Sequence, residues 1–235
     1  MPRIFPVLAV IAIVCLGAAF VSWRVLSARK EPPLVHTITE RQPQTANAAT
    51  AAIPDPGWEG VTVPDFVLVD QDGREVTQSV LDGRVTLVDY FFSDCPFVCP
   101  GLTAAMLRLS DALEGTDVQF LSVSVNPTRD TPQRLKEYGS RYGADFSRWR
   151  FLTGDPATVE RMVRDGLGFE LRDDPERPID LGGGETMINI VHPSHIVLIG
   201  PKREILGIYL FQFEEQLEMA EARARVLAES LRSRR

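Results

Sequence analysis

Two cysteines four positions apart, Cys95 and Cys99, are the residues of this chain most suited to chemistry. Each is followed by a proline in the segment FFSDCPFVCPGL (91–102). Proline is tolerated in the first turn of a helix and disfavours helical geometry in the residue before it. We therefore predict that a helix begins at about Pro100 and that the two thiols bracket a loop at its N-terminus. The positive end of a helix lowers thiol pKa values, so this location favours thiolate.

Two kinds of chemistry suit a thiolate pair at such a turn. The pair can cycle between dithiol and disulfide, or it can bind a soft metal ion. Three residues, PFV, separate the cysteines, one more than in the usual redox motif. The wider loop suits two sulfurs that converge on one ion, but it does not forbid a disulfide, and both alternatives stay open.

A metal site needs further ligands, and histidine is the natural candidate. Beyond residue 60 the chain has two histidines, His192 and His195, both in INIVHPSHIVLIG (188–200). A closed zinc site usually has four ligands, whereas two thiolates and one imidazole suit copper, because thiolates stabilise Cu(I) and imidazole tolerates Cu(II). Side chains alternate along an extended segment, so we expect one of the two histidines to join the thiols. The spacing does not say which one.

The elements around these residues alternate between strand and helix. Apolar runs predict strands at 65–70, 85–93, 118–126, 149–154, 195–200 and 205–211. Helical periodicity and capping residues predict helices at 100–115, 131–143, 155–168 and 214–235. The runs at 85–93 and 118–126 are continuously apolar, which is typical of strands buried on both faces. The order of elements predicts an α/β fold in which helices flank a mixed sheet.

The N-terminal part of the chain differs in composition from the rest. Residues 4–23 carry no charge and form a run about long enough to cross a ~30 Å hydrocarbon core. The run exceeds the usual apolar region of a signal peptide, so we favour an uncleaved anchor over residues 1–30. The Pro-, Ala- and Thr-rich residues 31–60 are interpreted as a flexible tether, and residues 61–235 as the folded domain.

Charge and cysteine content narrow the class of protein further. The net charge is −7, and the first 30 residues contribute four positive charges and no negative one, which leaves −11 for the remainder. Such a domain is repelled by nucleic acid and by anionic membrane surfaces. Two cysteines outside the anchor exclude a scaffold held together by several disulfides.

Three segments resemble the signature segments of the Sco/SenC family. They are DYFFSDCPFVCPGL (89–102), LSVSVNPTRDTPQRLKEY (121–138) and VHPSHIVLIGP (191–201), within a resemblance that covers about 61–231. Members are copper-binding proteins of thioredoxin-like fold that serve assembly of the dinuclear copper centre of cytochrome c oxidase. The resemblance implies a thioredoxin-like fold behind an N-terminal transmembrane helix. It also implies that Cys95, Cys99 and His192 are the copper ligands.

The chain departs from the family pattern at three positions. Val191 stands where the family commonly has Asp before the histidine, and Asn126 stands where it commonly has Asp before a proline. Both replacements remove negative charge that orients the imidazole or tunes the potential of the site. Pro193 follows the histidine, and we predict the His192–Pro193 bond as a candidate cis peptide bond.

Three functional hypotheses follow. The first is a copper metallochaperone of the bacterial inner membrane whose periplasmic domain takes copper from a donor and delivers it to the copper-binding subunit of cytochrome c oxidase. The second is an extracytoplasmic thiol-disulfide reductase that uses Cys95 and Cys99 as its redox pair, is re-reduced by a thioredoxin-like protein and needs no histidine. The third is a sensor that binds a partner through the acidic segment 172–185, although we interpret this segment, with its three glycines, as a mobile solvated loop.

Overall fold

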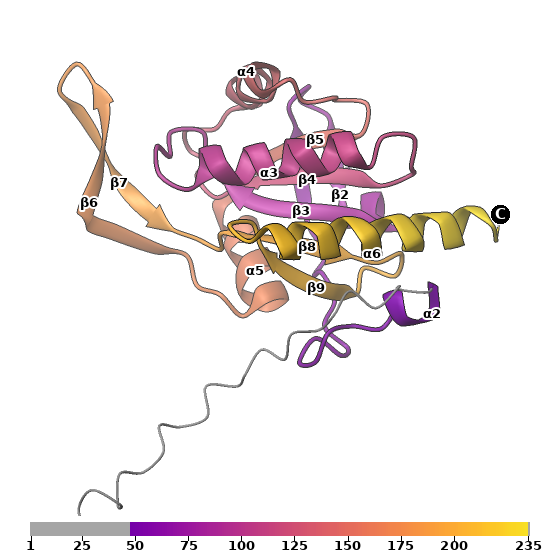
Figure 1. The fold of residues 1–235 in the computed structure, drawn as a ribbon. Helices are drawn as coiled ribbons and strands as arrows, with labels where there is room; N and C mark the ends of the chain where they lie inside the picture. Colours follow the sequence, from indigo (N-terminus) through magenta and orange to yellow (C-terminus); the bar gives the residue numbers. More distant parts are fainter. Residues whose placement is uncertain (1–47, 235) are drawn as a thin grey trace, which may run out of the picture. The chain divides into compact units, whose positions relative to one another are not determined.

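A seven-stranded mixed sheet forms the centre of the protein in a computed structural model that describes residues 48–234 (Figure 1). The strand order is β2-β1-β5-β4-β3-β8-β9, with β3, β4 and β5 parallel and the flanking pairs antiparallel. The strands are β1 (Val67–Asp70), β2 (Glu75–Thr77), β3 (Thr86–Phe91), β4 (Gln119–Ser124), β5 (Trp149–Gly154), β8 (His195–Ile199) and β9 (Ile205–Leu210). The prediction of an α/β fold with a mixed sheet is confirmed.

The two continuously apolar runs form the central strands. All six residues of β3 and all six of β4 are buried, because helices cover the sheet on both faces. Parallel neighbours need a crossover connection, and helices supply it between β3 and β4 and between β4 and β5.

The helices of the described residues are α2 (Ala48–Ala51), α3 (Cys99–Ala112), α4 (Pro132–Tyr142), α5 (Pro156–Leu167) and α6 (Glu214–Arg232), with a 3-10 turn, η1, at Gln78–Leu81. Four of the helices lie within three residues of their predicted bounds, whereas α2 and the turn η1 were not predicted. The Thr131 side chain caps α4, Pro132 occupies its first turn, and Gly143 ends it with a φ of 76°. In α5 the Asp155 side chain caps the N-terminus, and Gly168 ends the helix with a φ of 64°.

The two faces of the sheet pack against different helices. Phe91 of β3 contacts Tyr138 of α4, with ring centroids 5.0 Å apart. Val88 and Tyr90, which point to the opposite face, line a small cavity together with Met162 of α5. Figure 1 shows α3 and α6 side by side over the sheet, and an ion pair between Arg108 and Glu214 joins them. Residues 92–98 connect the end of β3 to the N-terminus of α3.

A second, two-stranded sheet occupies the segment that we interpreted as a solvated loop, so the prediction of a loop is wrong, although most residues of its first strand are exposed. β6 (Arg172–Gly182) and β7 (Glu185–Val191) pair with each other in a hairpin that stands beside the main sheet (Figure 1). Ile179 of β6 is 1% exposed and belongs to the core. The glycines at 182–184 all have positive φ values and form the turn, so they are explained by its geometry.

Part of the predicted tether also differs from the prediction. Ala51 in α2 is buried, and Arg223 of α6 donates hydrogen bonds to the Ala51 carbonyl and to Asp55, each at 2.9 Å. Residues 48–60 thus belong to the same compact unit as the rest of the domain. The predicted anchor and the first part of the tether lie outside the described residues. Between residues 48 and 234, no helix has both the length and the apolar character that a membrane span requires.

One carboxylate of the core lacks a full set of partners. Asp89 in the middle of β3 is completely buried, and one of its oxygens accepts a hydrogen bond from Ser122 of β4 at 2.5 Å. Its other oxygen has no hydrogen-bond partner in the described part of the chain. Burial, which disfavours the charged form, raises the pKa of Asp89 to about 7.

We predict that Asp89→Asn reduces the dependence of stability on pH. The folded protein holds the Asp89 proton more tightly than the unfolded chain, whose pKa is about 4, so this group stabilises below about pH 4 and loses that contribution as pH rises through 7. About two pKa units of this loss fall between pH 5 and pH 8.5, which corresponds to on the order of 3 kcal/mol. Urea unfolding of residues 45–235 at pH 5 and pH 8.5 measures it. An Asn variant that kept the wild-type pH dependence would contradict the prediction.

Candidate metal centre

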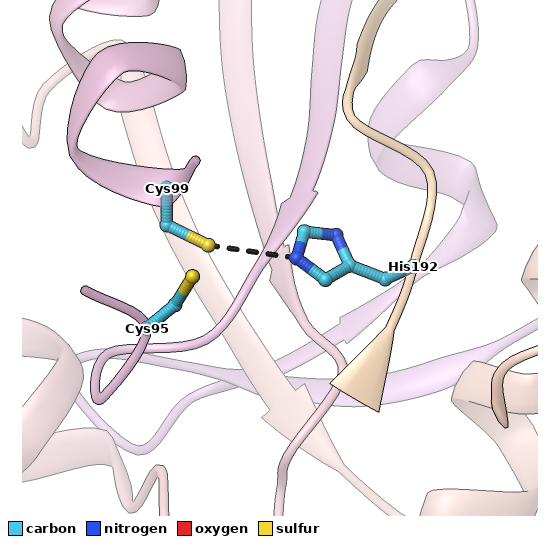
Figure 2. Close-up of side chains that lie close together, drawn as sticks. All are labelled: Cys95, Cys99 and His192. Carbon is cyan, nitrogen blue, oxygen red and sulfur yellow. Dashed lines mark hydrogen bonds between the residues drawn. The ribbon is translucent and has the colours of Figure 1, made fainter. Parts of the chain in front are cut away.

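Three side chains from distant parts of the chain meet at one end of the main sheet. Cys95 lies in the loop after β3, Cys99 is the first residue of α3, and His192 follows β7. Their ligand atoms all lie within 4.8 Å of one another, and Cys99 Sγ lies 3.6 Å from His192 Nε2 (Figure 2). The structure thus brings together the three residues that the family resemblance implies as ligands.

The local sequence explains the position of the two sulfurs. The chain leaves β3 and turns at once, with the Cys95 N–H bonded to the Phe92 carbonyl at 3.2 Å. Pro100 follows Cys99 in the first turn of α3, and no side chain caps the helix at Val98. The helix begins one residue before the predicted Pro100, so Cys99 is its first residue and is not extended. Both free thiols are therefore held at a helix N-terminus and are buried.

The backbone and an aromatic ring orient His192. Its Nδ1 lies 3.0 Å from the Pro193 carbonyl oxygen, and because a carbonyl only accepts, this contact places the proton on Nδ1. The Nε2 lone pair is then free to face Cys99. The imidazole and the Phe92 ring pack in a T-shaped arrangement, with ring centroids 5.6 Å apart. All peptide bonds of the described residues are trans, so the predicted cis His192–Pro193 bond is wrong.

The second histidine lies apart from this cluster. His195 is the first residue of β8, where it pairs with Leu210 of β9. Its side chain is half-buried, and burial lowers its pKa. One of the two histidines meets the thiols and the other does not, as the alternation of side chains predicts.

The two thiols differ in acidity. The pKa of Cys95 is well below that of a free thiol, chiefly because Cys99 donates a hydrogen bond to the Cys95 sulfur. The pKa of Cys99 is raised, because its proton is engaged by Cys95 and because its side chain is buried. These opposite shifts favour Cys95 over Cys99 as the thiolate of the pair.

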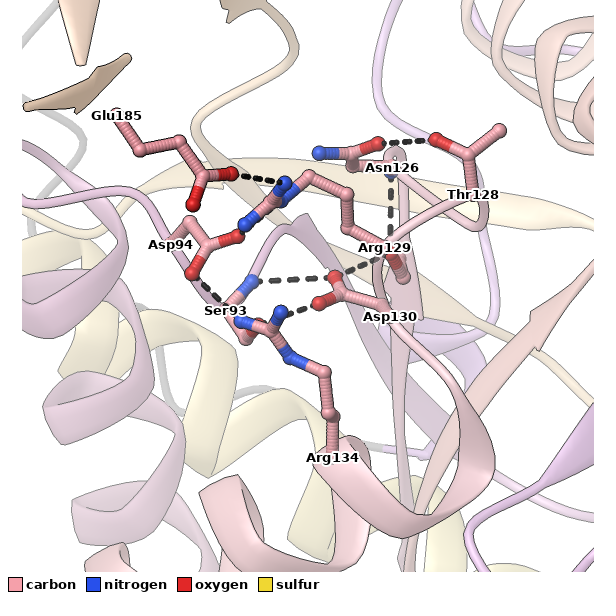
Figure 3. Close-up of polar contacts among 9 residues, drawn as sticks. Ser93, Asp94, Asn126, Thr128, Arg129, Asp130, Arg134 and Glu185 are labelled. Carbon is pink, nitrogen blue, oxygen red and sulfur yellow. Dashed lines mark hydrogen bonds and ion pairs between the residues drawn. The ribbon is translucent and has the colours of Figure 1, made fainter. Parts of the chain in front are cut away.

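A polar network beside Cys95 was not singled out from the sequence. Asp94 accepts hydrogen bonds from Arg129 at 2.8 Å and from Arg134 at 2.6 Å (Figure 3). The buried Asp130 accepts hydrogen bonds from the backbone and side chain of Ser93. Each residue lies in a segment that resembles the family, SDCP or NPTRDTPQR, but only the fold shows that they meet.

The two departures from the family pattern also lie near the site. The buried Asn126 follows β4, and its side-chain oxygen accepts a hydrogen bond from Thr128 at 2.9 Å. Val191 is the last residue of β7 and directly precedes His192. Neither position supplies a carboxylate, and the acidic residue nearest in sequence to the ligands is Asp94, which directly precedes Cys95.

Comparison with known proteins assigns the family. The SCO1/SenC family model matches residues 57–228, which include all three clustered side chains. The chain belongs to the SCO1/SenC family. The SCO1 protein homolog of Bacillus subtilis is 33% identical over 150 residues, which are 63% of this chain and 72% of the relative. Protein SenC of Rhodobacter capsulatus is 28% identical over 146 residues, 61% of each chain.

Solved structures of SCO1/SenC proteins share the fold. A SCO1/SenC family lipoprotein from Bacillus anthracis is 27% identical, with a TM-score of 0.60 over 72% of this chain and 95% of the other. BsSco, described as a Sco family cytochrome c oxidase assembly protein with a disulfide switch, is 29% identical, with a TM-score of 0.58 over 73% and 97%. Copper-bound ScoI of Bradyrhizobium japonicum has a TM-score of 0.51 over 73% and 98%, and at 23% identity the likeness shows the fold alone.

We predict that Cys99→Ala raises the pKa of Cys95, because the substitution removes the hydrogen bond that chiefly stabilises the Cys95 thiolate. The rate of alkylation by iodoacetamide against pH, measured on reduced protein in a Cys15→Ser background, reports this pKa. Cys99→Ser keeps a hydroxyl donor and serves as the matched control, with an inflection close to that of the wild type. An inflection that did not move in Cys99→Ala would show that another group stabilises the thiolate.

Proposed function

We propose that this protein is a membrane-anchored copper metallochaperone that binds one copper ion through Cys95, Cys99 and His192 and delivers it to the dinuclear copper centre of cytochrome c oxidase. The observation that carries the proposal is the convergence of two sulfurs and one imidazole nitrogen within 4.8 Å, buried, in a SCO1/SenC domain. Structures of ScoI with copper bound support it, as does the description of BsSco as an oxidase assembly protein.

The donor set suits copper in both of its common oxidation states. Two thiolates are soft ligands for Cu(I), and the imidazole is also a good ligand for Cu(II). The Cys95 thiolate is ready to bind, whereas Cys99 releases its proton when its sulfur binds the metal. Copper binding is therefore expected to weaken as pH falls. Transfer proceeds by ligand exchange, in which thiolates of the receiving subunit replace those of the chaperone one at a time.

We further propose that residues 4–23 anchor the protein in the bacterial inner membrane with the domain in the periplasm. Support comes from the uncharged apolar run and from the oxidase client, whose copper subunit the domain must reach. A copper donor and a thioredoxin-like reductant then act in the same compartment. Protease added to spheroplasts is expected to digest the domain, and deletion of residues 1–30 to release it from the membrane fraction. A domain protected from protease in intact spheroplasts would contradict this topology.

A thiol-disulfide reductase is the second candidate, favoured by the unequal acidity of the two cysteines. The Cys95 thiolate attacks a client disulfide, forming a mixed disulfide and releasing one client thiolate. Cys99 then loses its proton and attacks Cys95, which forms the Cys95–Cys99 disulfide and releases the second client thiolate. A thioredoxin-like reductant restores the dithiol. This chemistry does not use His192, so reductase turnover that survives His192→Ala would support it.

We predict one tightly bound copper ion per chain, weakened by each ligand substitution. Cu(I) is added to the reduced full chain in detergent, in a Cys15→Ser background, against a competing chelator. Cys95→Ser and Cys99→Ser are expected to lose at least about 100-fold in affinity, and His192→Ala about 10- to 100-fold, because a lost ligand costs at least as much as a lost supporting contact.

His195→Ala is the matched control, because His195 lies outside the cluster and should bind copper like the wild type. Equal loss in His192→Ala and His195→Ala, or no loss in His192→Ala, would overturn the ligand assignment. Absence of tight copper binding in the wild type, together with reductase turnover, would favour the second candidate.

A further inference from the structure

One arginine connects the two segments that carry the clustered ligands. Arg129 Nε donates to Asp94 Oδ2 at 2.8 Å, and its Nη1 donates to Glu185 Oε1 at 3.3 Å (Figure 3). Asp94 directly precedes Cys95, and Glu185 begins β7, the strand that leads into His192. A single guanidinium therefore joins the cysteine loop to the histidine strand.

The β6–β7 hairpin has few other polar ties to the domain. Its two strands pair with each other and with no strand of the main sheet. Its remaining ion pair, between Arg177 and Asp174 at 2.7 Å, lies within the hairpin. Among the ion pairs of the described residues, Arg129–Glu185 alone joins the hairpin to the rest of the protein. Apolar packing also attaches the hairpin, through the buried Ile179 and the partly buried Met187 and Ile190.

The two halves of this bridge differ in strength. The Asp94 side chain is 14% exposed, so its ion pair with Arg129 is largely shielded from solvent. A second ion pair, with Arg134, also holds Asp94 in place. The Glu185 side chain is 65% exposed, and exposed ion pairs contribute only about 0 to 1 kcal/mol. Arg129 is thus held firmly to the cysteine loop and reversibly to the hairpin.

We propose that Arg129 is a positioning residue that holds His192 against the cysteine pair by binding Asp94 and Glu185 at once. The inference rests on the proposed copper site. His192 is the single ligand contributed by the histidine strand, and holding that strand in place raises the effective concentration of the imidazole at the metal. The bridge therefore controls how long copper is retained. When the exposed Glu185 contact opens, the hairpin and His192 can move away while both sulfurs stay bound.

The first test is the rate at which copper leaves the protein. The full chain in detergent, in a Cys15→Ser background, is loaded with Cu(I) and mixed with excess chelator. Release is expected to be about 3-fold faster in Glu185→Gln, within the range for an exposed pair, and about 10-fold faster in Arg129→Gln, which loses both contacts. Arg177→Gln removes an ion pair internal to the same hairpin and is expected to release copper at the wild-type rate.

The second test repeats the Arg129→Gln substitution in a His192→Ala protein. It distinguishes an effect of Arg129 on the position of His192 from an effect on the fold of the cysteine loop. Because Arg129 acts through His192, Arg129→Gln in a His192→Ala protein is expected to leave the release rate of the His192→Ala protein unchanged. The same 10-fold acceleration in that background would show that Arg129 only supports the fold of the cysteine loop, and it would overturn the proposal.

A third measurement does not depend on copper. Hydrogen exchange of the amides of residues 185–191 in the reduced, copper-free protein is expected to be faster in Glu185→Gln and Arg129→Gln than in the wild type and Arg177→Gln. Equal exchange in all four proteins would overturn the proposal. If the wild type bound no copper, the proposed function would fail, while hydrogen exchange would still decide whether the bridge holds the histidine strand.

Discussion

The antiparallel pairing of β3 with β8 is the constraint on which the site depends. Asp89 of β3 lies opposite Ile196 of β8, so the end of one strand and the start of the other lie at the same edge of the sheet. The cysteine loop follows β3, and His192 comes just before β8. Residues almost a hundred positions apart therefore meet because a ladder of backbone hydrogen bonds in the core fixes where each segment leaves the sheet. Burial of every residue in β3 makes a shift of this register costly, since it would turn apolar side chains away from their packing partners.

Most strands and helices of the main sheet and its covering layers could be predicted from local sequence signals. Continuous apolar runs predicted β3 and β4, and Thr131 with Pro132 predicted the start of α4, because these signals are local. The hairpin at 172–191 was missed because its residues are mostly polar and exposed, and because Pro175 and Pro178 interrupt the alternation that identifies a strand. The choice of His192 over His195 came from the family resemblance, because the alternation of side chains does not rank the two. The network of Asp94, Arg129 and Arg134 joins distant segments and needs the tertiary structure.

The unequal acidity of the two thiols links the two candidate functions. A stabilised Cys95 thiolate is both a good first ligand for a soft metal and a good nucleophile toward a disulfide. The Cys99 proton must leave in either reaction, so both depend on the group that receives it. What distinguishes them is the imidazole, which adds a third donor to a metal and adds nothing to a disulfide. Of the two proposed functions, copper binding requires His192 close to the sulfurs and disulfide chemistry does not. In this structure the β6–β7 hairpin, which leads into His192, pairs with no strand of the main sheet.

The irregular pairing of β6 has a consequence for the solubility of the protein. A hairpin that joins no larger sheet presents two strand edges, and regular edges with unpaired backbone groups are templates for association with other chains. In β6 the register shifts between Asp174 and Ile179, and the prolines at 175 and 178 lack the N–H groups that an added strand would bond. Charged side chains of both signs flank this break. The β6 edge of the hairpin is therefore a poor template for a further strand.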